Sequence, residues 1–206
     1  VVLKKAMAPL DEKAVIDGEI RDSALVNKAI SQAIKEGESS LNDSVSKYVV
    51  IVPPLGFEVF EHSQTTSVVS PVGKIAKLDI ENVISQVSKA KTTDGSMIID
   101  ILPDAFILDQ GQTHMNPPIG ETSNSVTIKA KLHVLPIHLV QSHKKAYRQA
   151  NIQYAKMLVA PYCALAIAKQ SKTIPNDFLL IDIGARMTTI SLIGSKQVIA
   201  STFEYR

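Results

Sequence analysis

Residues 178–202, FLLIDIGARMTTISLIGSKQVIAST, decide the fold that the sequence predicts. The stretch opens with an apolar run typical of a buried strand, in which Asp182 is the only charge. Gly184 begins a turn into a second run of β-branched and polar residues. Gly194-Ser195 is then a two-residue hairpin signal, because Gly tolerates the positive φ of such turns. The stretch therefore predicts three strands joined by two tight turns.

The first of these turns is a candidate phosphate site. A carboxylate that ends a buried strand before a Gly turn can orient a metal-bound water beside backbone N–H groups able to cradle phosphate. Asp182 has that position, although it could equally serve only to cap the turn. Arg186 lies in the same turn, where its guanidinium could clamp a phosphate or could fill the space of a nucleotide. The residues alone leave these alternatives open.

Composition indicates an ordinary soluble globular chain. Its 206 residues fit one large or two small domains, and a formal net charge of +2 does not argue for nucleic acid or an anionic membrane. Its one cysteine, Cys163, excludes an internal disulfide and suits a reducing compartment. No apolar run is long enough for a transmembrane helix, and no signal peptide is visible. Since the first residue is not Met, we expect a piece of a longer protein.

Strands alternate with helices on both sides of a distinct central region, which indicates an α/β core with a mixed sheet. In the first part, Asp22 and Ser23 are candidate N-caps of a helix that Gly37 is expected to end. Tyr48 to Val52 is a strand run, halted by two prolines.

The central region reads as a compact α+β module. Two short strands, Phe57 to Phe60 and Thr65 to Val69, precede an amphipathic helix that Asp79 is expected to cap. Apolar strands and a Gly/Pro-rich loop, residues 110–123, lead to a long alternating strand, Ser125 to Leu135. This order predicts a strand-helix-strand-strand insert.

Known catalytic and metal motifs are missing from the sequence. The five histidines lack metal-ligand spacing, and no G-x-S-x-G, Walker A, G-x-G-x-x-G or H-E-x-x-H pattern occurs. Asp104 and Asp109 are five residues apart in strand context, so they are expected on opposite faces. The sequence therefore predicts no catalytic residue and no metal site.

Several segments, in order along nearly the whole chain, resemble the FtsA family of bacterial division proteins, which belongs to the actin-like ATPase superfamily. Each motif is weak alone, and their order and spacing carry the resemblance. The motifs are Gly18-x-Ile20-x-Asp22, the strand before Pro53-Pro54, Leu78 to Val83, Ile101 to Asp109, Asn116-Pro117-Pro118-Ile119-Gly120, and Leu180 to Ile193.

The resemblance implies an α/β (α+β) fold with an actin-like, ribonuclease-H-like mixed sheet and an inserted SHS2-type subdomain. Residues 1–54 and 136–170 would form most of subdomain 1A. Residues 55–135 would be the inserted subdomain 1C, and residues 171–206 the start of subdomain 2A. Proteins of this family bind ATP and Mg²⁺ between 1A and 2A, with weak or no turnover, and self-assemble into filaments through 1C.

The same resemblance implies an adaptor that tethers FtsZ to the cytoplasmic face of the inner membrane at the septum and recruits later division proteins. Nucleic acid is not an expected partner. The membrane would be reached only through a C-terminal helix beyond Arg206, and the first phosphate hairpin would precede Val1. Within the second hairpin Asp182, Gly184 and Thr188 match the family pattern, whereas Ala185, Arg186, Met187 and Thr189 depart from it.

Two sets of site residues follow. Asp182, Gly184, Arg186 and Thr188 are the expected phosphate-binding residues, although the departures lead us to expect no nucleotide binding by this chain. The loop 110–120 is the expected protein contact, through the residues His114, Met115, Asn116, Pro117 and Ile119, unless the loop is only a connector.

Other functions stay open. An adaptor resembling PilM of type IV pilus systems is one, because its phosphate hairpin can also read D-I-G-A-x. An actin-fold ATPase such as a sugar kinase is another, but no residue stands out as its catalytic carboxylate.

Overall fold

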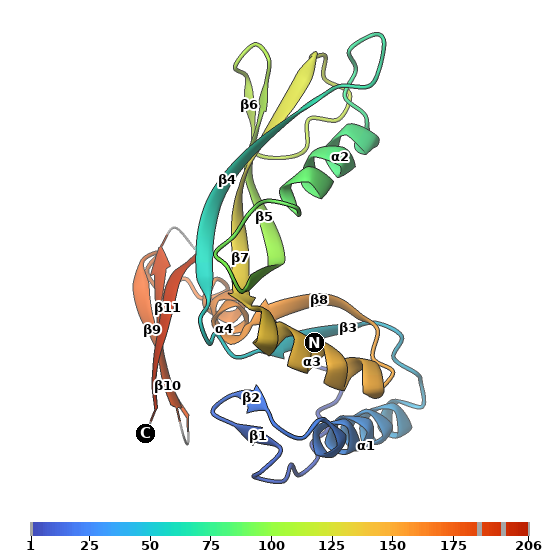
Figure 1. The fold of residues 1–206 in the computed structure, drawn as a ribbon, viewed down its shortest axis with the longest axis vertical. Helices are drawn as coiled ribbons and strands as arrows, with labels where there is room; N and C mark the ends of the chain where they lie inside the picture. The colour runs from blue at the N-terminus through green and yellow to red at the C-terminus, as the bar shows by residue number, and fades with distance from the viewer. Residues whose placement is uncertain (1, 185–186, 195–196, 206) are drawn as a thin grey trace. The chain divides into compact units, whose positions relative to one another are not determined.

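The computed structural model describes residues 2–184, 187–194 and 197–205, which fold as two compact units (Figure 1). The outer unit comprises Val1–Phe57 and Leu135–Arg206. The inserted unit comprises Glu58–Val134. Among the described residues, no helix is both long and apolar enough to cross a membrane.

The outer unit contains small sheets and helices from both ends of the chain. Strand β3 pairs in parallel with β8, which follows it by about a hundred residues, and β9, β10 and β11 form an antiparallel sheet with β10 in the centre. The elements are β1 (Val15–Ile16), β2 (Glu19–Ile20), α1 (Ser23–Leu41), β3 (Tyr48–Val52), α3 (Ile137–Gln149), β8 (Tyr154–Val159), α4 (Ala160–Ala168), β9 (Phe178–Ile183), β10 (Met187–Gly194) and β11 (Gln197–Tyr205).

Helix α1 begins where the sequence predicts and ends later than predicted. The Asp22 carboxylate accepts the N–H groups of Ala24 and Leu25 at 2.9 and 3.1 Å, which confirms it as the N-cap. Gly37 does not end the helix. It is tolerated inside, at a cost of about 1 kcal/mol relative to Ala. The helix ends instead after Leu41, because Asn42 adopts the left-handed conformation with φ of 53°.

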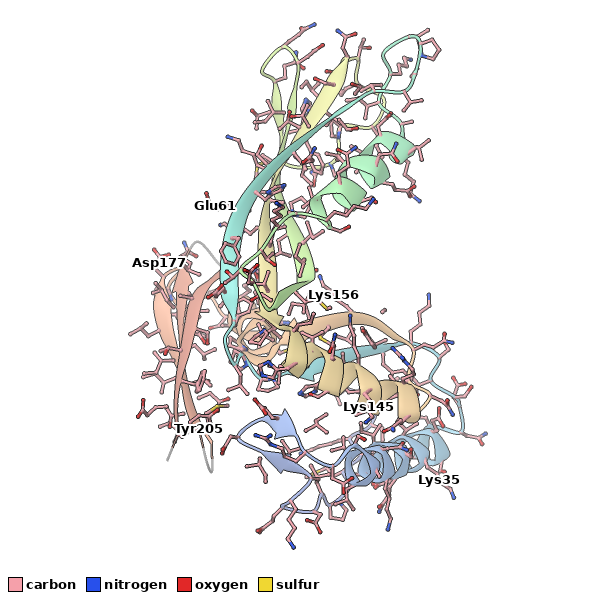
Figure 2. All side chains as sticks on the ribbon, viewed as in Figure 1. Lys35, Glu61, Lys145, Lys156, Asp177 and Tyr205 are labelled. Atoms are coloured by element: carbon pink, nitrogen blue, oxygen red, sulfur yellow. The ribbon has the colours of Figure 1, made fainter. Side chains whose placement is uncertain are left out.

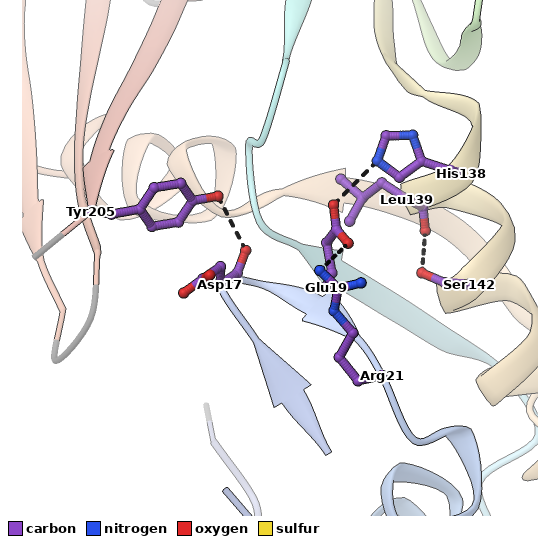
Figure 3. A network of polar contacts seen from close by, with 7 residues as sticks. All are labelled: Asp17, Glu19, Arg21, His138, Leu139, Ser142 and Tyr205. Atoms are coloured by element: carbon purple, nitrogen blue, oxygen red, sulfur yellow. Dashed lines mark hydrogen bonds and ion pairs between the residues drawn. The ribbon is translucent and has the colours of Figure 1, made fainter. Parts of the chain in front are cut away.

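The β1–β2 hairpin is held between helices and the end of β11 (Figure 3). The Glu19 carboxylate lies 3.0 Å from the Arg21 guanidinium and 3.3 Å from His138 Nε2 on α3. The Tyr205 hydroxyl donates to the Asp17 carbonyl at 3.5 Å. Beneath the hairpin, Ala14 is fully buried in a cluster shared with α1 and α3.

The inserted unit is a four-stranded sheet with one helix packed on it. Its elements are β4 (Glu58–Ser67), α2 (Lys77–Val87), β5 (Ser96–Leu108), β6 (Thr113–His114) and β7 (Ser125–Pro136), and the sheet order is β4-β7-β5-β6. Alternate residues of β7 face α2 and build the core, as the period of two in the sequence predicts. The core is formed by Ile75, Ile80, Val83, Val87, Phe106, Leu108, Val126, Ile128, Ala130 and Leu132.

Two predictions within the inserted unit are wrong. The expected short strands are a single ten-residue strand, β4, since its polar middle is paired along its whole length with β7. Asp79 is not the N-cap of α2, because the helix already begins at Lys77 with Ala76 as its cap. The Asp79 carboxylate instead turns back and accepts the N–H of Ala76 at 2.8 Å.

Candidate functional site

The turn between β9 and β10 brings three of the four expected phosphate residues together. Ile183 lies opposite Thr188 and Asp182 opposite Thr189 in the antiparallel register. Gly184 closes the turn by donating its N–H to the Met187 carbonyl at 2.9 Å. Arg186, the fourth expected residue, lies outside the described residues.

Gly184 has a structural reason to be glycine. A Cβ at this position would lie 2.9 Å from the Met187 carbonyl oxygen, closer than real Cβ contacts come. The missing side chain therefore makes room for the turn's own backbone, which explains this glycine without any phosphate.

A groove of about 330 Å³ lies beside the turn. The first turns of α4 form one wall, through Ala160, Pro161 and Ala164, and Asp182 and Thr189 contribute to the other. None of the described lining residues is basic, and Pro161 has no N–H to offer at the helix N-terminus. A phosphate beside the Asp182 carboxylate would need a compensating cation. The described residues of this half-site therefore do not fit a phosphate by themselves.

Metal ligation is not supported elsewhere in the described part of the chain. No group of three or more His, Cys, Asp or Glu side chains lies close enough there to hold an ion.

The inserted unit has a second candidate site, where two loops are held side by side. The Ile75 N–H donates to the Glu121 carbonyl at 2.9 Å, and the Gly120 N–H donates back to the Ile75 carbonyl at 2.8 Å. The Ser123 N–H reaches the Gly73 carbonyl at 2.8 Å. These bonds join residues 68–76 to residues 115–123, and we call the two segments the paired loops.

Asp79 fixes the first of the paired loops. Its carboxylate is 1% exposed and accepts the N–H of Val69 at 2.9 Å as well as that of Ala76. One buried side chain thus ties both ends of the loop to the first turn of α2. A loop held in this way presents a fixed surface.

Exposed apolar side chains gather on this surface. The inserted unit has five large hydrophobic residues that are more than half exposed, and all lie in the paired loops or at the start of α2. They are Val69, Val72, Leu78, Met115 and Ile119, with exposures of 67, 72, 56, 74 and 56%. We call this set the apolar rim. Exposed apolar residues are ordinary when scattered, but here all five lie in the two paired loops or at the start of α2, which makes this surface a candidate for protein contact.

The residues predicted in the loop 110–120 fall in different environments. Met115 and Ile119 belong to the apolar rim, and Asn116 and Pro117 are exposed beside them. His114 is partly buried in β6, and its Nε2 atom has no hydrogen-bond partner among the described residues.

Sequence reasoning missed Val69, Val72 and Leu78. The signal for the two valines was the run SVVSPVG, residues 67–73, in which valines stand among the Ser, Pro and Gly residues of a turn rather than at strand or helix spacing. Leu78 lies outside this run, at the start of α2.

Known proteins match both parts of this architecture. Residues 57–135 match the family model described as the SHS2 domain inserted in FtsA. A solved structure described as the PilM–PilN type IV pilus biogenesis complex is 17% identical and covers 97% of this chain, with a TM-score of 0.52. This chain spans only 54% of the length of that one. The shared fold confirms the predicted mixed α/β class, and residues 57–135 are similar to the SHS2 domain inserted in FtsA.

A second solved structure, from Bacteroides thetaiotaomicron VPI-5482, is described as a protein with an actin-like ATPase fold and unknown function. It is 8% identical over 93% of this chain and 58% of its own, with a TM-score of 0.36. No curated protein matches the chain significantly.

Proposed function

We propose that the chain is part of an FtsA-like division adaptor, an actin-like protein that self-assembles through its inserted unit. In this proposal it tethers FtsZ to the cytoplasmic face of the inner membrane at the septum and recruits later division proteins. Residues 55–135 act as subdomain 1C, residues 1–54 and 136–170 as most of 1A, and residues 171–206 as the start of 2A.

The apolar rim is the observation that carries the proposal. It lies within the segment that matches the FtsA insert, and its backbone is fixed by the Asp79 carboxylate and by the ladder between the paired loops. A rigid surface of exposed aliphatic side chains loses little conformational freedom on binding, so it suits protein contact rather than catalysis. The proposed contact residues are therefore Met115 and Ile119, flanked by His114, Asn116 and Pro117.

Nucleotide belongs to the proposal only for the complete protein. ATP and Mg²⁺ would be held there by elements beyond the groove beside Asp182, with Gly184, Arg186 and Thr188 supplying part of one phosphate turn. Calorimetric titration of Mg-ATP into this chain and into a longer one tests whether nucleotide binding needs those further elements. We expect no heat of binding when Mg-ATP is titrated into this chain. Micromolar binding to this chain would contradict that expectation.

Substitution in the apolar rim tests the assembly role. Met115→Asp and Ile119→Asp put a carboxylate in the proposed contact, so we expect full-length protein with either change to lose filament assembly and partner recruitment. Ser85→Asp is the matched control, since it adds the same charge at an exposed position of α2 away from the rim. The proposal fails if the two rim variants assemble and recruit as the control does.

A PilM-like pilus adaptor is the second candidate, favoured by the fold shared with the PilM–PilN structure. Pull-down separates the two, with full-length protein offered an FtsZ tail peptide in one arm and a pilus-protein N-terminal peptide in the other. Retention of the FtsZ peptide alone supports the division role. Retention of the pilus peptide alone would replace it.

A further inference from the structure

The outer strand of the inserted sheet leaves one edge unpaired within its unit. In the order β4-β7-β5-β6, the strand β4 pairs only with β7. That pairing runs from Glu58 to Ser67 without a shift in register, so the ten-residue edge has no bulge to twist it away from a neighbour. A long regular edge presents a row of backbone donors and acceptors ready to pair with another strand.

The two edges of this sheet differ in protection. The far edge carries Pro103, which lacks an N–H, together with Asp100 and Asp104, and the short strand β6 covers Phe106 and Ile107. The edge strand β4 contains neither Pro nor Lys, the residues that often prevent an edge strand from pairing with another chain. Its second half, Ser63 to Ser67, carries no charge at all.

The charges of β4 disfavour one way of pairing it with a second copy. Both carboxylates, Glu58 and Glu61, lie in the first half, and Figure 2 labels Glu61 on this strand. A parallel, in-register copy would set each Glu against its own counterpart, which is destabilising. An antiparallel copy whose two-fold axis passes Ser63 sets Glu61 opposite Thr65 and Val59 opposite Ser67. Each carboxylate then faces an uncharged residue, and the arrangement is symmetric and closed.

We propose that β4 pairs antiparallel with β4 of a second copy of this chain, about Ser63, so that two inserted units share one continuous sheet. The contact is isologous and uses the edge of the sheet. It is separate from the apolar rim and does not depend on the function proposed above.

Charge placed on the axis tests the pairing. Ser63→Glu is tolerated within one chain, because Ser63 is exposed and lies opposite Lys129 on β7. Across the axis the two new carboxylates would face each other, so we expect the dissociation constant for self-association, measured by analytical ultracentrifugation, to rise about tenfold or more. Ser85→Glu is the control, since it adds the same charge at an exposed position of α2, outside both β4 and the apolar rim.

Disulfide trapping gives an independent readout of register. In a Cys163→Ser background, Ser63→Cys places two thiols directly opposite each other, with Cα atoms about 4.5–5.5 Å apart, which suits a disulfide. Oxidation should yield a covalent dimer. Ser67→Cys should not, because each thiol would face Val59 of the other copy. A chain that stays monomeric up to about 1 mM overturns the proposal. So does association that Ser63→Glu leaves unchanged, or equal trapping through positions 63 and 67.

Discussion

The Asp79 carboxylate accepts the backbone N–H of Val69, ten residues earlier, at 2.9 Å. Its other oxygen accepts the N–H of Ala76 at 2.8 Å, and the side chain is 1% exposed. The first of the paired loops therefore has its shape set by one buried anion. The position of Val69 and Val72 in the apolar rim follows from that contact.

Replacing Asp79 by Asn is expected to lower the free energy of unfolding by about 2 kcal/mol. The Asn amide has only one oxygen, so it can accept from only one of the two buried N–H groups. The other N–H is left without an acceptor, and the remaining hydrogen bond is no longer to a charged group. Urea denaturation measures the change. Glu81→Gln, which removes the exposed pair with Lys77 at 3.3 Å on the same helix, is the control and is expected to cost under about 0.5 kcal/mol. Equal losses in the two variants would contradict the role of Asp79.

Asp109 gives the inserted unit an acid-sensitive contact. The Asn124 N–H and side-chain amide reach Asp109 Oδ2 at 2.9 and 2.8 Å. The backbone N–H of Asn124 first, then the Ser123 hydroxyl, hold the pKa of this carboxyl below its usual 3.8. A depressed folded pKa contributes stability that is present above the unfolded value and lost as pH falls below it.

The Asp109→Asn variant is therefore expected to be less stable than wild type at pH 7 and pH 5, with a gap that closes toward pH 3. Urea midpoints at the three pH values measure it. Asp94→Asn, at an exposed turn position, is the control for loss of charge alone. A gap that stays constant down to pH 3 would show that ionisation of Asp109 contributes nothing.

The sequence predicted the Asp22 cap and the turn at Gly184 correctly, because both depend on contacts between residues close together in the chain. Asp22 caps α1 because its acceptor and the two N–H groups lie within three residues. The hairpin after Asp182 forms because Gly184 leaves room for the Met187 carbonyl.

The features that were missed in the inserted unit depend on pairing between residues far apart in the sequence. No residue near Asp79 in the sequence indicates that its carboxylate accepts the N–H of Val69. The apolar rim exists because residues 73–75 pair with residues 120–123, and no period of two or 3.6 connects them. Similarly, the polar middle of β4 is strand only because β7 lies along it.

Gly56 is predicted to be intolerant of any side chain. Its φ is 64°, and a Cβ there would lie 2.7 Å from Pro136 Cγ. Gly56→Ala is expected to cost about 2–4 kcal/mol in urea denaturation, from backbone strain and from the clash. Gly95→Ala separates the two effects, since Gly95 has a φ of 80° with nothing within 4 Å of the added methyl group, and this variant should cost only about 1 kcal/mol of backbone strain. Similar losses in both variants would mean that Pro136 yields to the new methyl group.

His143 makes the outer unit sensitive to mild acid. The ring is 8% exposed on α3, and its Nδ1 lies 3.2 Å from the Tyr147 hydroxyl. Burial lowers the pKa of His143 below its ordinary 6.5, and the Gly18 carbonyl opposes that shift only in part. The unfolded chain therefore binds a proton at a pH where the folded chain does not. The contribution of His143 to stability is full above about pH 6.5 and is lost as pH falls below that value.

We expect the urea midpoint of the chain to fall between pH 7.5 and pH 5.5, and His143→Phe to flatten that fall. Phe keeps an aromatic ring against Tyr147 but cannot titrate, so the variant is less stable at pH 7.5 yet loses less on acidification. His138→Gln is the matched control on the same helix, where the side chain is 66% exposed beside Glu19, and it should leave the slope nearly unchanged. A His143→Phe variant that keeps the slope of the wild type would contradict this prediction and show that the buried ring contributes packing alone.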